Sequence, residues 1–335
     1  MKAWACDVSV VVPIFNDGDC LVELVERLVE VFGRLPYSYE LVMVDDGSRD
    51  RTPYLLAQLA ERFEWLRVIR LARNFGQEPA VQAGMSVSRG RWVVQLDADL
   101  QHPPEELPKL LSKAEDGYEV VYGVRKNRQD PYHRILLSKA MQFVMRRGFG
   151  IDLPEDISTF RVVDGELARF IARLPEQRKF FSALASWVGA KGASVPVEHR
   201  ARASGRSSYT LAKLLSHSLD LMAGFSIRPL RIIGAAGAGF ATLGILYACY
   251  KIAEKLCGVD IEMGYTSLFS AIVIIGGVNL IALSVIGEYV GRVFLETQGR
   301  PPYRILEDYG AGSETSVGSH ESRPMLGGPA VEVRL

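Results

Sequence analysis

The first half of the chain alternates between short hydrophobic runs and longer segments in which apolar residues recur every three or four positions. The runs are rich in β-branched residues and predict five strands, at Val8–Phe15, Glu40–Val44, Leu66–Leu71, Arg91–Leu96 and Glu119–Val124. The segments between them predict helices at about 18–33, 51–63, 77–88 and 104–116. Alternating strands and helices predict an α/β domain with a mostly parallel sheet and helices on both faces.

Two segments in the last third of the chain are apolar and carry no charge. The first, Ile232 to Tyr250, has 19 uncharged residues, and the second, Met263 to Gly287, has 25. About 20 helical residues cross the roughly 30 Å hydrocarbon core of a bilayer. We therefore predict transmembrane helices at about 230–253 and 263–290. The alternative is a pair of buried core helices, which seldom run this long without a charge.

The net charge of the chain is zero, but the charge is unevenly distributed along it. The 39 basic and 39 acidic residues cancel, which argues against a nucleic-acid-binding protein, yet residues 199–231 hold six basic residues and one acidic residue. Leucines at helical spacing within 199–231 predict an amphipathic helix at the cytoplasmic membrane surface, with packing on the soluble domain as the alternative. Basic residues flank both apolar segments on their outer sides, so we expect both termini in the cytoplasm.

The predicted organisation has four parts. They are a cytoplasmic α/β domain at 1–198, the basic segment at 199–231, a membrane domain of two helices at 232–295, and a cytoplasmic tail at 296–335 that is disordered from about 310.

Polar clusters follow the first four predicted strands. Their sequences are PIFND at 13–17, DDGSRDRT at 45–52, RNFGQE at 73–78 and DADLQH at 97–102. One such cluster is explained equally well by a solvated turn. Four at successive strand ends indicate a ligand site, because the carboxyl ends of parallel strands meet at one edge of a sheet.

The residue types in these clusters suit a nucleotide-sugar. Asp97 and Asp99 would share one face of a regular strand, or would point around a cation where the strand ends. Carboxylates suit a hard cation such as Mg²⁺ or Mn²⁺. Such an ion neutralises a diphosphate leaving group. Asp45 or Asp46 can accept hydrogen bonds from a base or ribose, and Phe15 offers an aromatic face near the base.

In this order, the clusters resemble family 2 glycosyltransferases of the Rossmann-like GT-A fold. More narrowly, they resemble the branch that contains dolichol-phosphate mannose synthase and the bacterial polyprenyl-phosphate glycosyltransferases. The resemblance continues through YGVRKNR at 122–128, DISTFR at 156–161, RASGRSSY at 202–209 and GEYVGR at 287–292. It covers about residues 7 to 305.

The resemblance implies an inner-membrane enzyme whose catalytic domain is cytoplasmic. It would transfer a sugar, with inversion and metal assistance, from a nucleotide diphosphate sugar to polyprenyl (undecaprenyl) phosphate. A UDP-linked glucose or modified aminoarabinose is the expected donor. Self-association, with a tetramer as the form suggested by relatives, is also implied.

The resemblance further implies roles for individual residues. The expected donor-binding residues are Pro13, Phe15, Asp17, Asp45, Asp46 and Gln77. The expected metal- and diphosphate-binding residues are Asp97, Asp99 and Gln101. The expected acceptor-phosphate residues are Arg125, Arg128, Arg134, Ser138 and Arg202. Asp99 and Asp156 are the expected catalytic residues, since Asp156 lies where relatives have a proposed base.

The sequence departs from some bacterial relatives at Thr159, where they carry an acid before the Phe-Arg pair. A lipid phosphate monoester has a second pKa near 6, so it is already nucleophilic at neutral pH. It needs positioning more than deprotonation, and we expect Asp156 to orient a group rather than to accept a proton.

Two other functions fit parts of the pattern. A non-catalytic membrane scaffold would not need Asp97 and Asp99, which are both present. A processive polysaccharide synthase usually carries a Gln-x-x-Arg-Trp motif and more membrane spans, and the sequence QRKF at 177–180 does not fit that motif.

Overall fold

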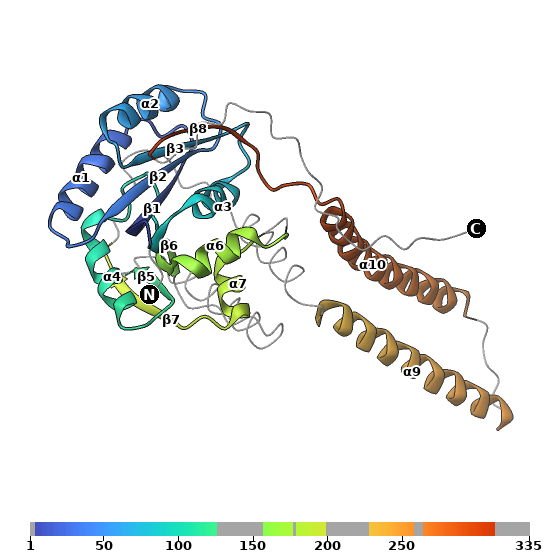
Figure 1. The fold of residues 1–335 in the computed structure, drawn as a ribbon. Helices are drawn as coiled ribbons and strands as arrows, with labels where there is room; N and C mark the ends of the chain where they lie inside the picture. The colour runs from blue at the N-terminus through green and yellow to red at the C-terminus, as the bar shows by residue number, and fades with distance from the viewer. Residues whose placement is uncertain (1–3, 126–156, 177–178, 199–227, 258–263, 312–335) are drawn as a thin grey trace, which may run out of the picture.

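A computed structural model describes the chain in five segments, 4–125, 157–176, 179–198, 228–257 and 264–311. An eight-stranded sheet lies at its centre, in the order β7-β5-β6-β4-β1-β2-β3-β8 (Figure 1). The strands are β1 Cys6–Ile14, β2 Tyr39–Asp45, β3 Leu66–Leu71, β4 Gly90–Gln95, β5 Val120–Arg125, β6 Ile157–Asp164, β7 Gly192–Val197 and β8 Ile305–Gly310.

The sheet is mixed. Strands β1 to β4 pair in parallel, as do β5 and β7, whereas β6 runs antiparallel between β4 and β5. At the other edge β8 runs antiparallel to β3. All five predicted strands are present and point the same way, while β6, β7 and β8 were not predicted.

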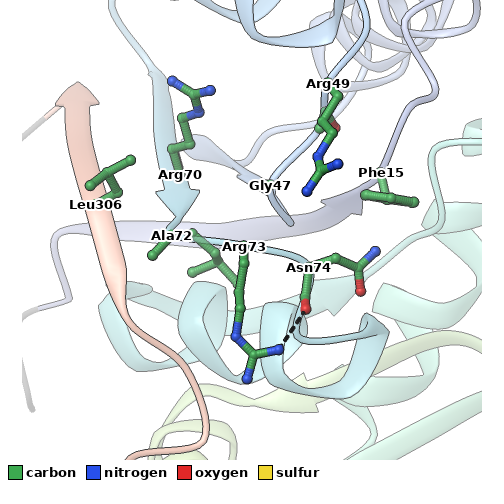
Figure 2. Close-up of a pocket in the computed structure, with 10 residues that line it drawn as sticks. Phe15, Gly47, Arg49, Arg70, Ala72, Arg73, Asn74 and Leu306 are labelled. Atoms are coloured by element: carbon green, nitrogen blue, oxygen red, sulfur yellow. Dashed lines mark hydrogen bonds between the residues drawn. The ribbon is translucent and has the colours of Figure 1, made fainter.

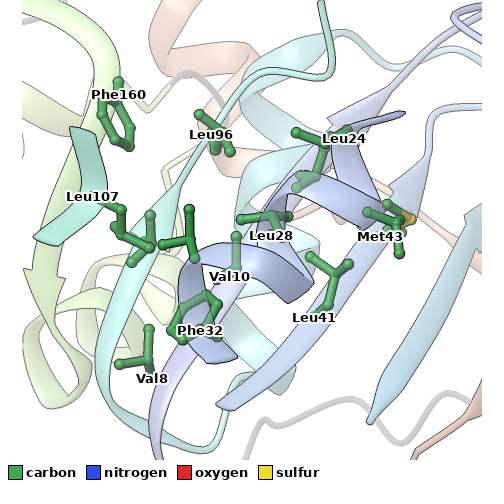
Figure 3. Packing of buried hydrophobic residues seen from close by; sticks show 14 of the residues in the cluster. Val8, Val10, Leu24, Leu28, Phe32, Leu41, Met43, Leu96, Leu107 and Phe160 are labelled. Carbon is green, nitrogen blue, oxygen red and sulfur yellow. The ribbon is translucent and has the colours of Figure 1, made fainter. Parts of the chain in front are cut away.

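Helices cover both faces of the sheet. They are α1 Leu21–Gly33, α2 Thr52–Arg62, α3 Gln77–Val87, the short 3₁₀ helix η1 Pro104–Glu106, α4 Leu107–Glu115, α6 Gly165–Arg173 and α7 Phe181–Val188. Alternate residues of β1 face opposite sides, so Val10 packs with α1 and α4 (Figure 3), whereas Val11 packs with α3 and α6. The predicted α/β architecture with two helical layers is confirmed.

Two long helices, α9 Arg228–Leu256 and α10 Tyr265–Thr297, lie side by side and project from the α/β domain (Figure 1). Leu230–Tyr247 and Ile274–Thr297 have mean hydropathies of 1.5 and 1.6, and neither segment buries any residue. A helix that is apolar and exposed all round fits a lipid environment. Both predicted spans are therefore helices of membrane-crossing length, and the second continues past its expected end at about 290.

The chain returns to the α/β domain after α10. Residues 298–304 lead to β8, which pairs with β3 at the sheet edge. The sequence pattern assigned residues 305–310 to a tail, whereas the structure makes them part of the sheet. Most of the predicted interfacial segment, 199–227, lies outside the described residues.

Candidate active site

Two adjoining cavities open at the carboxyl ends of β1 to β4. The larger, of about 440 Å³, is called here the β3 cavity (Figure 2) and is lined by Phe15, Gly47, Ser48, Arg49, Arg70, Leu71, Ala72, Arg73, Asn74 and Leu306. The smaller, of about 320 Å³, is called the acidic cavity and is lined by Pro13, Ile14, Phe15, Asp17, Asp46, Asn74, Gly76, Gln77, Ala80, Asp97, Ala98 and Asp99. Phe15 and Asn74 belong to both cavities, so one elongated ligand can occupy the two together.

Asp97 lies two residues after the end of β4 and is held by two side chains. Gln77 Nε2 donates to Oδ1 at 2.7 Å, and Thr159 Oγ1 donates to Oδ2 at 2.5 Å. Burial raises the pKa of Asp97, and the nearby Asp99 charge adds to that rise, while the two hydrogen bonds oppose it. Each carboxylate oxygen keeps a second lone pair for a ligand.

A buried guanidinium lies close to Asp97. Arg161 of β6 stacks on Phe181, with Cζ 3.9 Å from the ring centroid, and donates to Gln95 Oε1. Burial lowers the pKa of Arg161, and its positive charge opposes the rise in the pKa of Asp97. A buried positive charge thus lies near Asp97.

Asp99 lies in a strained turn. Its Oδ1 accepts a hydrogen bond from Gln101 N at 3.1 Å, and Leu100 between them has φ of 57°. A left-handed backbone costs a leucine about 1–2 kcal/mol. Such strain persists where the surrounding structure fixes a functional geometry, and here it shapes the turn that presents Asp99 to the acidic cavity.

Asp45 and Asp46, at the end of β2, hold neighbouring loops. Asp46 accepts from Phe75 N at 2.7 Å and from Gly76 N at 2.8 Å, so it fixes the entry to α3, and burial raises its pKa. Asp45 accepts from Ser48 N at 2.8 Å. It is fully buried and lines neither cavity.

Arg70 both contacts Asp45 and lines the β3 cavity. Its Nε lies 3.4 Å from Asp45 Oδ2, and its side chain lines the cavity. From the sequence, Arg70 was predicted only as part of a strand. The parallel register that places it opposite Asp45 is the signal that would have identified it.

A close approach of two loops requires a glycine after Asp46. Gly47 has φ of 71°, and a Cβ there would lie 2.5 Å from the carbonyl carbon of Arg73. The turn after β2 therefore packs directly on the loop after β3, and both line the β3 cavity.

The structure brings together most of the expected donor and metal residues. Those that line the acidic cavity are Pro13, Phe15, Asp17, Asp46, Gln77, Asp97 and Asp99. Those that lie outside the described residues are Arg128, Arg134, Ser138, Asp156 and Arg202. Arg125 ends β5, and its side chain is not among those described. The acceptor-phosphate set and the role of Asp156 stay predictions.

The donor set suits a divalent cation bound together with substrate. Within the described segments no three His, Cys, Asp or Glu side chains form a complete metal cluster. Asp97 and Asp99 offer hard oxygen ligands, and phosphate oxygens of a substrate can supply others.

Two family models match the chain. The Glycosyl transferase family 2 model matches residues 9–170, and the GtrB C-terminal hairpin model matches residues 228–293. An uncharacterized glycosyltransferase of Synechocystis sp. is 36% identical over 306 residues, which cover 91% of this chain and 96% of that protein.

Functionally named relatives match along nearly the same length. The undecaprenyl-phosphate 4-deoxy-4-formamido-L-arabinose transferase of Shewanella sediminis is 34% identical, over 90% of this chain and 92% of that protein. The protein of the same name from Pseudomonas aeruginosa is 35% identical, over 91% of each. Among solved structures, glucosyl-3-phosphoglycerate synthase of Mycobacterium tuberculosis with UDP has a TM-score of 0.49 and 19% identity, over 67% of this chain and 80% of that one.

Proposed function

The chain belongs to glycosyltransferase family 2 and has its GT-A fold, and from this premise we propose that it transfers a sugar from a nucleoside diphosphate sugar to undecaprenyl phosphate. The observation that carries the proposal is the pair of joined cavities, one lined by carboxylates and the other by guanidinium groups and an aromatic ring. The relatives named for undecaprenyl phosphate, which match about nine-tenths of the chain, support the acceptor.

The donor would occupy both cavities. We assign the nucleoside to the β3 cavity, where Phe15 is 45% exposed and Arg49, Arg70 and Arg73 offer only hydrogen-bond donors to base carbonyls or to phosphate. The diphosphate would then reach the acidic cavity. Asp97 and Asp99 would hold Mg²⁺ or Mn²⁺ there, and such an ion, when bound, neutralises charge on the diphosphate.

The chemistry is one displacement at the anomeric carbon. An oxygen of the lipid phosphate forms the new bond to that carbon, and the bond to the diphosphate oxygen breaks, with its electron pair leaving on the nucleoside diphosphate. A single displacement inverts the configuration. The phosphate dianion needs no proton removed, so the expected role of Asp156 is to orient rather than to act as a base.

The membrane helices would bring this site to its lipid acceptor. We propose that α9 and α10 cross the inner membrane with both termini in the cytoplasm, which puts the link at 258–263 on the far side. The names of these relatives favour 4-deoxy-4-formamido-L-arabinose over glucose as the transferred sugar, and UDP as its carrier stays a prediction. Self-association stays a prediction.

The test uses the full chain in lipid nanodiscs containing undecaprenyl phosphate and Mn²⁺. A panel of labelled UDP-sugars is supplied, and the lipid extract is analysed by mass. We expect one glycosylated lipid from the wild-type chain and a loss of roughly 100-fold or more in Asp99→Asn. Asp116→Asn, which removes a charge from an exposed ion pair with Lys113, is the matched control and should retain activity.

Three outcomes would contradict the proposal. A scaffold would give no transfer with any sugar. A processive synthase would give water-soluble polymer in place of a lipid product. Equal activity of Asp99→Asn and the wild type would show that the carboxylate of Asp99 in the acidic cavity is not needed for transfer.

A further inference from the structure

Strand β8 contains an irregularity beside the β3 cavity. In its pairing with β3, Glu307 lies opposite Arg70 and Ile305 lies opposite Leu71, so Leu306 is an extra residue. A bulge of this kind bends a strand and re-aims a side chain. Leu306 lines the β3 cavity next to Arg70 and Ala72, and it is 53% exposed (Figure 2).

The same strand completes a row of charges across the sheet. Asp45, Arg70 and Glu307 lie opposite one another on β2, β3 and β8. Arg70 Nε is 3.4 Å from Asp45 Oδ2, and Arg70 Nη1 is 3.3 Å from Glu307 Oε1. Carboxylates on both sides restrain the one guanidinium in this row that lines the β3 cavity.

Other contacts attach β8 to the sheet, and the ion pair between Arg67 and Asp308 involves neither cavity. Arg67 forms a two-point ion pair with Asp308, from Nε to Oδ1 at 2.9 Å and from Nη2 to Oδ2 at 2.7 Å. Ala72 N donates to Arg304 O at 2.9 Å just before the strand. The attachment of β8 and its contribution to the cavity can therefore be perturbed separately.

We propose that β8 is part of the donor site, with Leu306 packing on the nucleoside and Glu307 positioning Arg70 toward it. The inference rests on the proposed function, because it assigns the β3 cavity to the nucleoside. Strand β8 follows α9 and α10 in the chain. Donor binding would therefore depend on the segment after α10.

The experiment measures binding of UDP, and separately of pyrophosphate, to the full-length protein in detergent with Mn²⁺. Leu306→Ala should raise the Kd for UDP about fivefold, and Glu307→Gln should raise it about threefold. Leu306→Met should restore binding to near the wild-type value. Pyrophosphate lacks the nucleoside, so its affinity should not change in any of these variants.

Two matched controls separate the cavity from strand attachment. Ile305→Ala removes a similar apolar side chain from the same strand, and Asp308→Asn weakens the ion pair with Arg67. Neither residue lines a cavity, and both variants should bind UDP as the wild type does.

The outcomes distinguish this inference from the proposed function. Failure of the wild-type chain to bind UDP or any other nucleoside diphosphate would count against both. Wild-type binding with no change in Leu306→Ala and Glu307→Gln would overturn the role of β8 alone. Equal weakening in the two controls would also overturn it, because the effect would then come from detachment of the strand.

Discussion

Thr159→Val gives the sharpest test of how the acidic cavity is organised. The substitution keeps the shape of the side chain and replaces its hydroxyl group with a methyl group. Asp97 Oδ2 would lose its hydrogen bond from Thr159, while Oδ1 would keep the one from Gln77 at 2.7 Å. The perturbation is therefore confined to one oxygen of one carboxylate.

The magnitude follows from the charge and burial of Asp97. A hydrogen bond to a charged group contributes about 1.5–3 kcal/mol, and each 1.4 kcal/mol corresponds to about tenfold. Asp97 is only partly exposed, so water replaces the lost donor incompletely. We expect kcat/KM for sugar transfer to fall roughly 10- to 100-fold, with a higher Mn²⁺ concentration needed for half-maximal rate.

The assay measures initial rates of lipid glycosylation against UDP-sugar and Mn²⁺ concentration. Thr159→Ser keeps the hydroxyl and should stay within about threefold of the wild type. Ser158→Ala changes the adjacent hydroxyl, which donates instead to Gly123 O at 2.8 Å, and should leave the Mn²⁺ dependence unchanged. Wild-type kinetics in Thr159→Val would show that this hydroxyl does not organise Asp97 in the working enzyme.

Two further predictions concern the donor loops and the membrane topology. Gly47→Ala should raise the Kd for UDP at least about tenfold, measured by calorimetry, because the new Cβ would lie 2.5 Å from the carbonyl carbon of Arg73 and the residue would keep a φ of 71°. Unchanged binding would mean that the two loops separate without affecting the cavity. Cys257, exposed directly after the last residue of α9, should react with a membrane-impermeant maleimide added outside spheroplasts when it is the chain's only cysteine. Labelling only after lysis would reverse the proposed topology.

Local sequence patterns were sufficient to predict the first five strands. These strands are covered by helices on both faces, so their residues form nearly continuous apolar runs that end at polar turns. Leu66–Leu71 was predicted with the bounds that the structure shows. The long uncharged runs that form most of α9 and α10 are also local patterns, and they were sufficient to predict these two helices.

Strands β6 and β8 depend on partners that the sequence does not place. β6 carries the buried Arg161, which is accommodated by Gln95 of β4 and by Phe181 of α7. β8 is short and acidic, and its charges are matched by arginines of β3, more than 230 positions away in the chain. Neither strand has a hydrophobic pattern of its own that distinguishes it from a loop.

The same division applies to the candidate site. The clusters at the ends of β1 to β4 were predicted to converge, and they supply Phe15, Asp46, Gln77, Asp97 and Asp99 to one cavity. Residues contributed by strand pairing were missed, above all Arg70, whose role depends on register. Local clusters of polar residues identify the loops that bind the ligand. Residues such as Arg70, which neighbouring strands bring to the site, cannot be identified in this way.

The hydroxyl group of Thr159 affects the ionisation of Asp97. An acid at this position would lie against Asp97, and two carboxylates that close cannot both ionise readily. Thr159 instead donates a hydrogen bond, which favours the charged form of Asp97 that a cation requires. The proposed nucleophile is a phosphate that is already ionised, so the chemistry does not need a proton acceptor at this point. We therefore expect the hydroxyl of Thr159 to stabilise a negative charge on Asp97 rather than to take part in proton transfer.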